Sequence, residues 1–231
     1  DIAMKIANAV GAEFSLDEQA SIERIPTDSA DAYRNYLASL ELNTNAHRDA
    51  KLNLLSLAIE SDPNFSLAYA SRAIVRARTL PRFLGPTNGS SLVAEQEALA
   101  LEDVSMALAL DPRLARAHLV RAIIESYNWQ GRAAQAAFEQ AAEYGPRDAG
   151  ILAVYATFKS AIGQNEEAIE MVQQAVALDP VSVSGAAGPI MEFAGELDRA
   201  IAIYSKLFAD GAGNTGIYGT NLGLMQVNRG N

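Results

Sequence analysis

Three stretches with the same layout decide the fold of this chain: ALEDVSMALALDP at residues 100–112, AQAAFEQAAEYGP at 134–146 and AIEMVQQAVALDP at 168–180. They start at equal intervals, and each carries alanine at its first and eighth positions and ends on proline. Pro63 and Pro112 lie further apart than one such interval, and an insertion between them accounts for the excess. A fixed period of this length indicates a repeat architecture in which similar supersecondary units are stacked.

The recurring residues have physical roles in packed helices. Proline has no backbone N–H and clashes with the preceding turn, so it ends one unit and begins the next. Alanine lets two helices approach to the short end of the ~8–10 Å packing range, and a larger apolar residue fills the groove beside it. The alanines are Ala58, Ala107, Ala141 and Ala175, the larger residues are Leu55, Val104, Phe138 and Val172, and the prolines are Pro63, Pro112, Pro146 and Pro180.

The period predicts five helix pairs and an incomplete sixth. The stretch TLPRFLGPTNGSSLV at 79–93 interrupts the second pair, and its two prolines and two glycines favour a loop. That loop is either a tolerated surface insertion or, through Arg82, Phe83 and Leu84, a contact patch. The expected pairs are 29–43 with 47–61, 66–79 with 92–110, 115–128 with 132–144, 149–162 with 165–178, and 183–194 with 196–209, followed by a half-pair at 215–229.

This layout resembles the tetratricopeptide repeat, a helix–turn–helix unit of about the same period, over residues 29–231. The resemblance implies an all-α fold, a right-handed superhelical solenoid of antiparallel helix pairs in which each pair leans on its neighbours. The early aromatic residue of the repeat is present as Tyr69 but is replaced by His118 and Leu152 in the next two units. A second departure is Lys51, which stands at the position of Ala100, Ala134 and Ala168 in the later units.

Residues 1–28 form a junction segment ahead of the repeats, with short helices expected at 2–12 and 15–24. Residues 1–42, which include this segment and a tyrosine-rich first repeat helix, are similar to the link between a TolB-like region and the repeats of bacterial class III adenylate cyclases and winged-helix regulators. That similarity implies a regulatory C-terminal module of a larger bacterial signalling protein. Because the chain begins at Asp1, inside an amphipathic pattern, we expect it to be a piece of that longer protein.

Composition argues against several classes of protein. The net charge of −10 argues against a nucleic-acid surface, because such surfaces are basic. The absence of cysteine excludes disulfides and thiolate metal sites, and no run of about 18 apolar residues is available to span a membrane. We therefore expect no nucleic-acid binding by this region and no membrane insertion. A cytoplasmic location is expected, with the periplasmic domain of a membrane-anchored regulator as the alternative.

Motifs for catalysis are weak. Residues 211–216 spell G-x-G-x-x-G, but a helix precedes them where a dinucleotide site needs a strand, so they are interpreted as a helix end and turn. His47 is expected in solvent and His118 in packing, and neither has a partner at metal-ligand spacing. The acidic pairs at 102–103 and 166–167 are interpreted as solvated surface. We therefore expect no enzyme activity, no cofactor and no metal.

Trp129 is the only tryptophan and is expected at a turn between two helices. Its surroundings, SYNWQGRAAQAAF, look like an element with Asn-Trp followed by alanine and phenylalanine in repeats of the same regulators. The simpler interpretation is a large ring that plugs the turn, with its indole N–H bonded nearby. A role as a ligand platform requires the ring to be exposed.

The predicted function is partner binding in a groove. In the tetratricopeptide family the first helix of each pair lines a concave surface, and residues seven and eleven positions after each repeat proline match that face. The lysines and asparagines with which chaperone-binding members grip a C-terminal carboxylate are absent there. The mostly apolar groove fits an inserted apolar helix or an extended peptide. Its predicted residues are Tyr33, Tyr36, Leu40, Ala70, Ile74, Arg78, Leu119, Ile123, Tyr127, Ala153 and Thr157.

Other occupants and functions stay open. The protein's own helix at 2–12 is an alternative occupant of the groove, since large exposed apolar patches are uncommon on monomers. The C-terminal half-pair leaves an apolar face that a longer chain, or a second copy in a homo-oligomer, would cover. The alternative functions are a small-ligand sensor that signals through superhelix curvature and the repeat tail of an adenylate cyclase or transcription regulator. An enzyme lacks a convincing set of residues.

Overall fold

The computed structural model describes residues 26–42, 46–78, 91–193 and 195–209, which form ten helices joined by turns, with no strand among them. The helices pair in chain order, and every end lies within three residues of its predicted place. The helices are α3 (Ala30–Glu41), α4 (Arg48–Ser61), α5 (Ser66–Ala77), α6 (Ser91–Leu110), α7 (Ala115–Tyr127), α8 (Gly131–Tyr144), α9 (Ala149–Ala161), α10 (Asn165–Leu178), α11 (Pro180–Phe193) and α12 (Leu197–Ala209).

Several predictions concern segments outside the described residues. They are the helices at 2–12 and 15–24, the greater part of the insertion with Arg82, Phe83 and Leu84, the glycine motif at 211–216 and the half-pair at 215–229.

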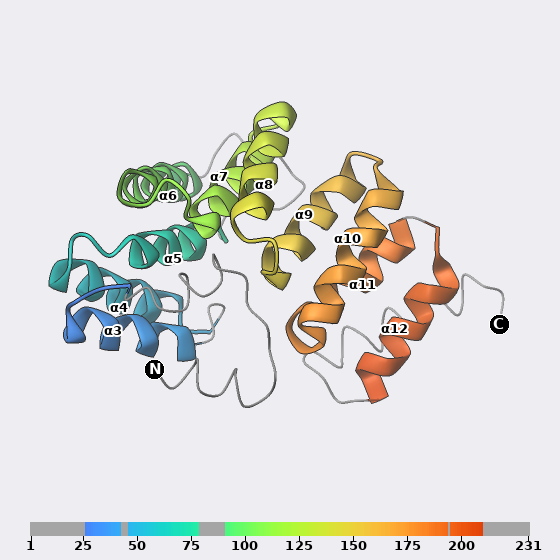
Figure 1. The fold of residues 1–231 in the computed structure, drawn as a ribbon, viewed down its shortest axis with the longest axis horizontal. Helices are drawn as coiled ribbons and strands as arrows, with labels where there is room; N and C mark the ends of the chain where they lie inside the picture. Colours follow the sequence, from blue (N-terminus) through green and yellow to red (C-terminus); the bar gives the residue numbers. More distant parts are fainter. Residues whose placement is uncertain (1–25, 43–45, 79–90, 194, 210–231) are drawn as a thin grey trace.

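The helix pairs follow one another along an arc, from α3 in blue to α12 in orange-red (Figure 1). Each helix packs against the next one in sequence, and the first helices α5, α7, α9 and α11 also pack against one another in succession. Among the described helices, the second helices of successive pairs make less direct contact with each other than these first helices do. The first helices therefore lie on the shorter, inner side of the arc.

The repeated alanines and bulky residues form the interior, as the sequence predicts. Ala58, Ala107, Ala141 and Ala175 are completely buried, and Phe138 is 1% exposed. Phe138 stacks on Tyr155 of the next pair with ring centroids 5.1 Å apart. The core is therefore a chain of small clusters between neighbouring helices, which suits a solenoid that grows by stacking.

The junctions between pairs are closed by local hydrogen bonds. The Asp62 carboxylate accepts from the backbone N–H of Asn64 at 2.9 Å, and the Asp111 carboxylate from that of Arg113 at 3.2 Å, so each aspartate shapes the turn that its proline begins. Gly145 replaces the aspartate at the third junction. A Cβ added there would lie 2.9 Å from Ile151 Cδ1 and 3.0 Å from Ala115 Cβ of α7, so a larger residue would force these side chains to shift.

The start of the fifth pair and the end of the insertion differ from the prediction. We expect the first helix of that pair to begin near residue 183, but α11 begins at Pro180. Proline fits the first helical position because its missing N–H would have no partner there. The helix also continues through Pro189. Likewise α6 begins at Ser91, so the last three residues of the predicted loop are helical.

Candidate functional site

The eleven predicted groove residues divide into two groups by exposure. Residues seven positions after a proline are buried in clusters that include residues of a neighbouring first helix. Residues eleven positions after a proline, one helical turn further on, are half-buried and reach the surface. Tyr36 and Leu40 of α3 repeat this division, with the tyrosine 6% exposed and the leucine 47% exposed. The buried members are Tyr36, Ala70, Leu119, Tyr127 and Ala153.

The accessible members at one shared repeat position, three aliphatic residues and a threonine, form what we call the inner stripe, defined as Leu40, Ile74, Ile123 and Thr157. These four residues come from four successive first helices, α3, α5, α7 and α9. The Thr157 hydroxyl donates to the backbone carbonyl of Ala153 at 2.9 Å, which satisfies its polar group within the helix. The inner stripe is thus an apolar line with little demand for polar partners. Tyr33 and Arg78, the other predicted members, are exposed.

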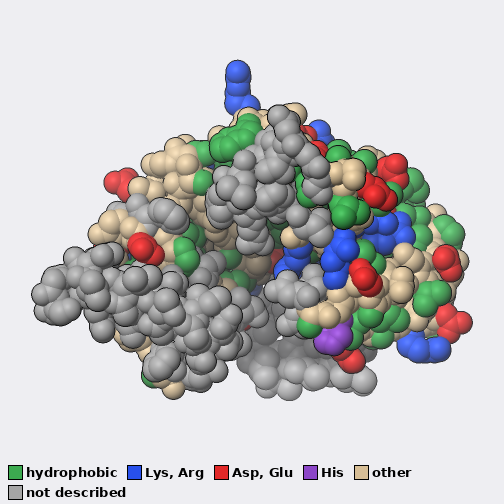
Figure 2. Space-filling view, turned by 180° about the vertical axis from the view of Figure 1, so that it is seen from behind, with side chains coloured by type: hydrophobic (Ala, Val, Ile, Leu, Met, Phe, Trp, Pro, Cys, Tyr) green, Lys and Arg blue, Asp and Glu red, His purple; other side chains and the backbone are tan. Residues whose placement is uncertain are grey.

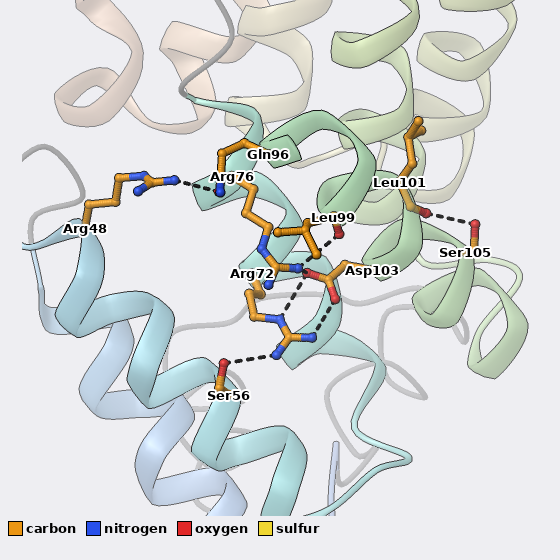
Figure 3. A network of polar contacts seen from close by, with 9 residues as sticks. All are labelled: Arg48, Ser56, Arg72, Arg76, Gln96, Leu99, Leu101, Asp103 and Ser105. Carbon is orange, nitrogen blue, oxygen red and sulfur yellow. Dashed lines mark hydrogen bonds and ion pairs between the residues drawn. The ribbon is translucent and has the colours of Figure 1, made fainter. Parts of the chain in front are cut away.

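A buried ionic network, shown in Figure 3, joins α4, α5 and α6. The Asp103 carboxylate is 2% exposed and accepts two hydrogen bonds from Arg72, at 3.1 and 2.7 Å. Arg76 donates to the same carboxylate at 2.5 Å and to the Leu99 carbonyl at 3.0 Å, and Arg72 also reaches the Ser56 hydroxyl at 3.0 Å. One buried carboxylate therefore accepts hydrogen bonds from two guanidinium groups. Burial lowers the pKa of Arg76, although the attraction of Asp103 opposes this change.

This network corrects the interpretation of residues 102–103 as solvated surface. Glu102 is exposed, but Asp103 lies inside and ties the second helix pair together. The arginine partners of Asp103 lie far from it in sequence, so the acidic dipeptide alone does not indicate them. The signal that was available is the spacing of Arg72 and Arg76, four residues apart on a helix made mainly of small and apolar residues.

Three basic residues lie at helix ends, Arg48 and Lys51 in the first turn of α4 and Arg78 at the C-cap of α5. Arg48 of α4 donates to Gln96 of α6 at 2.7 Å, and Lys51 Nζ lies 3.4 Å from the Leu42 carbonyl. Burial lowers the pKa of Lys51, and the positive charge of Arg78 lowers it further. In Figure 2 the lysine and arginine side chains in the right half lie over the early helix pairs, interspersed with aspartate and glutamate side chains.

Trp129 does not plug its turn, and that interpretation is wrong. Its side chain is 71% exposed, and its backbone has a positive φ of 58°. Its backbone N–H donates to the Ser126 carbonyl at 3.1 Å, and the N–H of Gln130 donates to the Glu125 carbonyl at 2.9 Å. The turn is thus held by backbone hydrogen bonds, and the ring projects into solvent.

The described residues offer no group of three or more histidine, aspartate or glutamate side chains that could hold a metal ion. His47 is exposed at the start of α4, as predicted. His118 is 6% exposed, packs on the Tyr144 ring at 5.3 Å and lies 2.9 Å from the Pro112 carbonyl through Nε2, as a packing residue would. None of the described helices is long and apolar enough to cross a membrane.

This geometry defines an all-α solenoid of stacked antiparallel helix pairs with a surface line of apolar residues on its inner row. No protein-family model and no curated protein matches the sequence. Solved structures match the fold. The thermophilic tetratricopeptide-repeat protein TTC0263 of Thermus thermophilus aligns with a TM-score of 0.67 at 18% identity, over 83% of this chain and 98% of that one.

Two further solved structures match the same fold. A tetratricopeptide-repeat protein from Parabacteroides merdae aligns with a TM-score of 0.60 at 18% identity, over 84% of this chain and 69% of that one. The pilF protein of Pseudomonas aeruginosa aligns with a TM-score of 0.55 at 19% identity, over 81% and 79% of the two chains. This chain therefore has the tetratricopeptide-repeat fold.

Proposed function

We propose that this chain is a non-catalytic interaction module that binds an extended peptide or an apolar helix of a partner protein along the inner stripe. The observation that carries the proposal is that one position of four successive first helices carries an accessible side chain, which is aliphatic in Leu40, Ile74 and Ile123 and a threonine in the fourth helix. A line of apolar sites at a regular spacing suits a ligand that is itself linear. The fold, which generally serves as a scaffold for protein partners, supports the same function.

The proposal extends to the setting of the module. The resemblance of residues 1–42 to the link before the repeats of bacterial cyclases and winged-helix regulators supports a place in a larger cytoplasmic signalling protein. A small-ligand sensor is the second candidate, because a solenoid whose inner row of helices is tightly packed would change curvature if a ligand wedged those helices apart. A metabolite screen by thermal shift separates the two, since a ligand of the folded state raises the melting temperature.

The test uses selection from a random-peptide display library on the whole chain. We expect wild-type protein to enrich peptides with apolar residues at regular intervals. Replacing Leu40 and Ile74 by glutamate should abolish the enrichment, because both side chains of the inner stripe become charged. Leu57→Glu and Met106→Glu serve as controls, since these residues are 46% and 44% exposed on the second helices α4 and α6.

Circular dichroism of each variant confirms that its helices are intact. Enrichment that survives Leu40→Glu with Ile74→Glu, or that is lost equally in the control variants, would show that the inner stripe is not the binding surface.

A further inference from the structure

Trp129 occupies a turn position that favours glycine. The turn between α9 and α10 and the turn between α11 and α12 have Gly163 and Gly195 there, with φ of 82° and 79°. In all three turns the backbone N–H of the following residue donates to the carbonyl five residues before it. Trp129 adopts the same left-handed conformation, with a φ of 58°. A bulky residue in this region is a clear outlier, because its Cβ crowds the backbone.

The indole ring of Trp129 does not repay this strain by packing. Its side chain is 71% exposed, more than any other large apolar residue in the described part of the chain. The backbone hydrogen bonds of the turn are also made where the residue is glycine. Strained residues cluster at functional sites, and tryptophan is among the residue types that most often anchor a protein interface. Stability therefore gives no reason for a tryptophan at this turn, whereas binding does.

A carboxylate lies beside the turn. The Asn128 side-chain amide donates to Glu97 Oε1 at 2.6 Å, so Glu97 contacts the residue that precedes Trp129. The donor is a neutral amide, and this hydrogen bond therefore leaves the negative charge of Glu97 in place. Glu97 belongs to α6, which has no basic residue in its sequence, in a chain with a net charge of −10. Negative charge next to an aromatic ring is complementary to a cation.

An exposed aliphatic side chain belongs to the same edge of the solenoid. Val93 packs against the core cluster that contains Tyr127, so the first turn of α6 lies along the end of α7. Leu92, the neighbour of Val93, is 68% exposed. The start of α6 and the turn after α7 thus present an aliphatic group, an indole ring and a carboxylate. Arginine and lysine have the complementary parts, an apolar stem and a cationic head.

We propose that Leu92, Glu97 and Trp129, which we call the tryptophan edge, form a second binding surface that takes an arginine or lysine side chain of a partner protein. The cationic head lies over the indole ring near Glu97, and the stem lies against Leu92. Arginine is the better fit, because its planar guanidinium stacks on an aromatic face. None of these residues belongs to the inner stripe, so the inference does not depend on the proposed function.

The experiment uses a random-peptide display library and the whole chain. Peptides that bind Trp129→Gly are removed first, and the remainder is selected on wild-type protein. The retained peptides should contain arginine or lysine. Because Trp129 is the only tryptophan of the chain, titration with a retained peptide should change the fluorescence of the protein.

Calorimetry then gives the affinity of one retained peptide for a set of variants. The affinity should fall about tenfold in Trp129→Gly and about threefold in Glu97→Gln. Glu139→Gln is the matched control, since this exposed glutamate also accepts from a side-chain amide, that of Gln135 at 2.9 Å, and it should retain the wild-type affinity. Arg132→Gln, at the basic residue nearest to Trp129 in sequence, should not weaken the peptide.

Trp129→Gly separates binding from folding, because it should weaken the peptide while it raises the melting temperature. A lower melting temperature in this variant contradicts the inference, since the ring would then serve packing. Retained peptides without a basic residue, an unchanged fluorescence on titration, or an equal loss of affinity in Glu139→Gln each overturn it. Failure to retain any peptide overturns it as well. None of these outcomes bears on the inner stripe, whose residues are unchanged in every variant.

Discussion

Trp129 and Gly163 occupy the same position of successive repeats, one period apart, and both have positive φ, at 58° and 82°. In each case the backbone N–H of the next residue donates to the carbonyl five residues earlier, from Gln130 to Glu125 and from Gln164 to Lys159. The turn is the same, and glycine is the residue that adopts this conformation without strain. Trp129 therefore carries strain that its exposed ring does not offset by packing.

We expect Trp129→Gly to increase the free energy of unfolding by about 0.5–1 kcal/mol. A non-glycine residue in the left-handed region costs roughly 1–2 kcal/mol, and glycine removes that cost. Glycine also has more conformational freedom in the unfolded chain, which offsets part of the gain in stability. Chemical denaturation measures the change. The matched control is Gly163→Ala, which should lower stability by about 1 kcal/mol, because its Cβ has nothing within 4 Å and only the backbone is affected. A loss of stability in Trp129→Gly would mean that the ring packs after all.

Asp103→Asn should lower the free energy of unfolding by about 3 kcal/mol. The change removes the charge that Arg72 and Arg76 share, and breaking a buried ion pair is costly because it leaves charge uncompensated in the interior. The two arginine side chains are 16% and 15% exposed, so water replaces the lost charge poorly. Urea denaturation followed by circular dichroism gives the value.

Glu102→Gln is the control for that experiment, since this neighbouring side chain is exposed and should change stability by less than about 0.5 kcal/mol. If the two variants are equally stable, the network of Asp103 contributes nothing beyond the packing of α5 on α6.

The helix pairs were predictable because their signal is local and repeated. Proline, alanine and a bulky apolar residue recur at fixed intervals, and each acts within its own pair, as Ala141 and Phe138 show by their burial. The caps followed the same logic. Ser29 directly precedes the first repeat helix, and its hydroxyl accepts from the backbone N–H of Ala32 at 3.2 Å, as serine commonly does at a helix start.

The candidate site was only partly predictable, since it depends on distances between repeats. Spacing after the proline placed Ala70 and Ile74 on one face of α5, but only the packing of neighbouring first helices buries the alanine and leaves the isoleucine half open. The same holds for Asp103, whose arginine partners stand 27 and 31 residues away. The exposure of Trp129 depends on where the turn directs its ring, which no neighbouring residue type reveals.

Gly145→Ala should lower stability by about 1–2 kcal/mol. The new Cβ would lie 2.9 Å from Ile151 Cδ1 and 3.0 Å from Ala115 Cβ, so the junction between the third and fourth pairs must shift. Gly131→Ala is the contrasting variant, because nothing lies within 4 Å of its Cβ and alanine favours the helix by up to about 1 kcal/mol. Thermal unfolding of the two variants should therefore move in opposite directions. A neutral Gly145→Ala would show that the junction is loosely packed.

Lys159 should make the free energy of unfolding fall at alkaline pH. Its side chain is 7% exposed, and its ammonium donates to Glu167 at 2.7 Å and lies 5.3 Å from the Tyr155 ring centre. Burial lowers the pKa of Lys159, but the hydrogen bond to Glu167 and the interaction with Tyr155 outweigh it and raise the pKa above its ordinary 10.5. The folded state thus holds this proton more tightly than the unfolded state does. The stabilisation is complete below about pH 10.5 and is lost as pH rises through the higher folded value.

Lys159→Met should reduce the decline of the free energy of unfolding with rising pH, because methionine fills the space without a titrating group. Tyr155 contributes in the same direction, since burial raises the pKa of its phenol, so part of the decline should remain in the variant. The measurement is the free energy of unfolding in urea from neutral pH to about pH 11 for wild type and variant. Lys206→Met, at an exposed lysine of α12, should leave the profile unchanged. Equal declines in wild type and Lys159→Met would show that the ion pair with Glu167 does not hold the proton of Lys159 in the folded state.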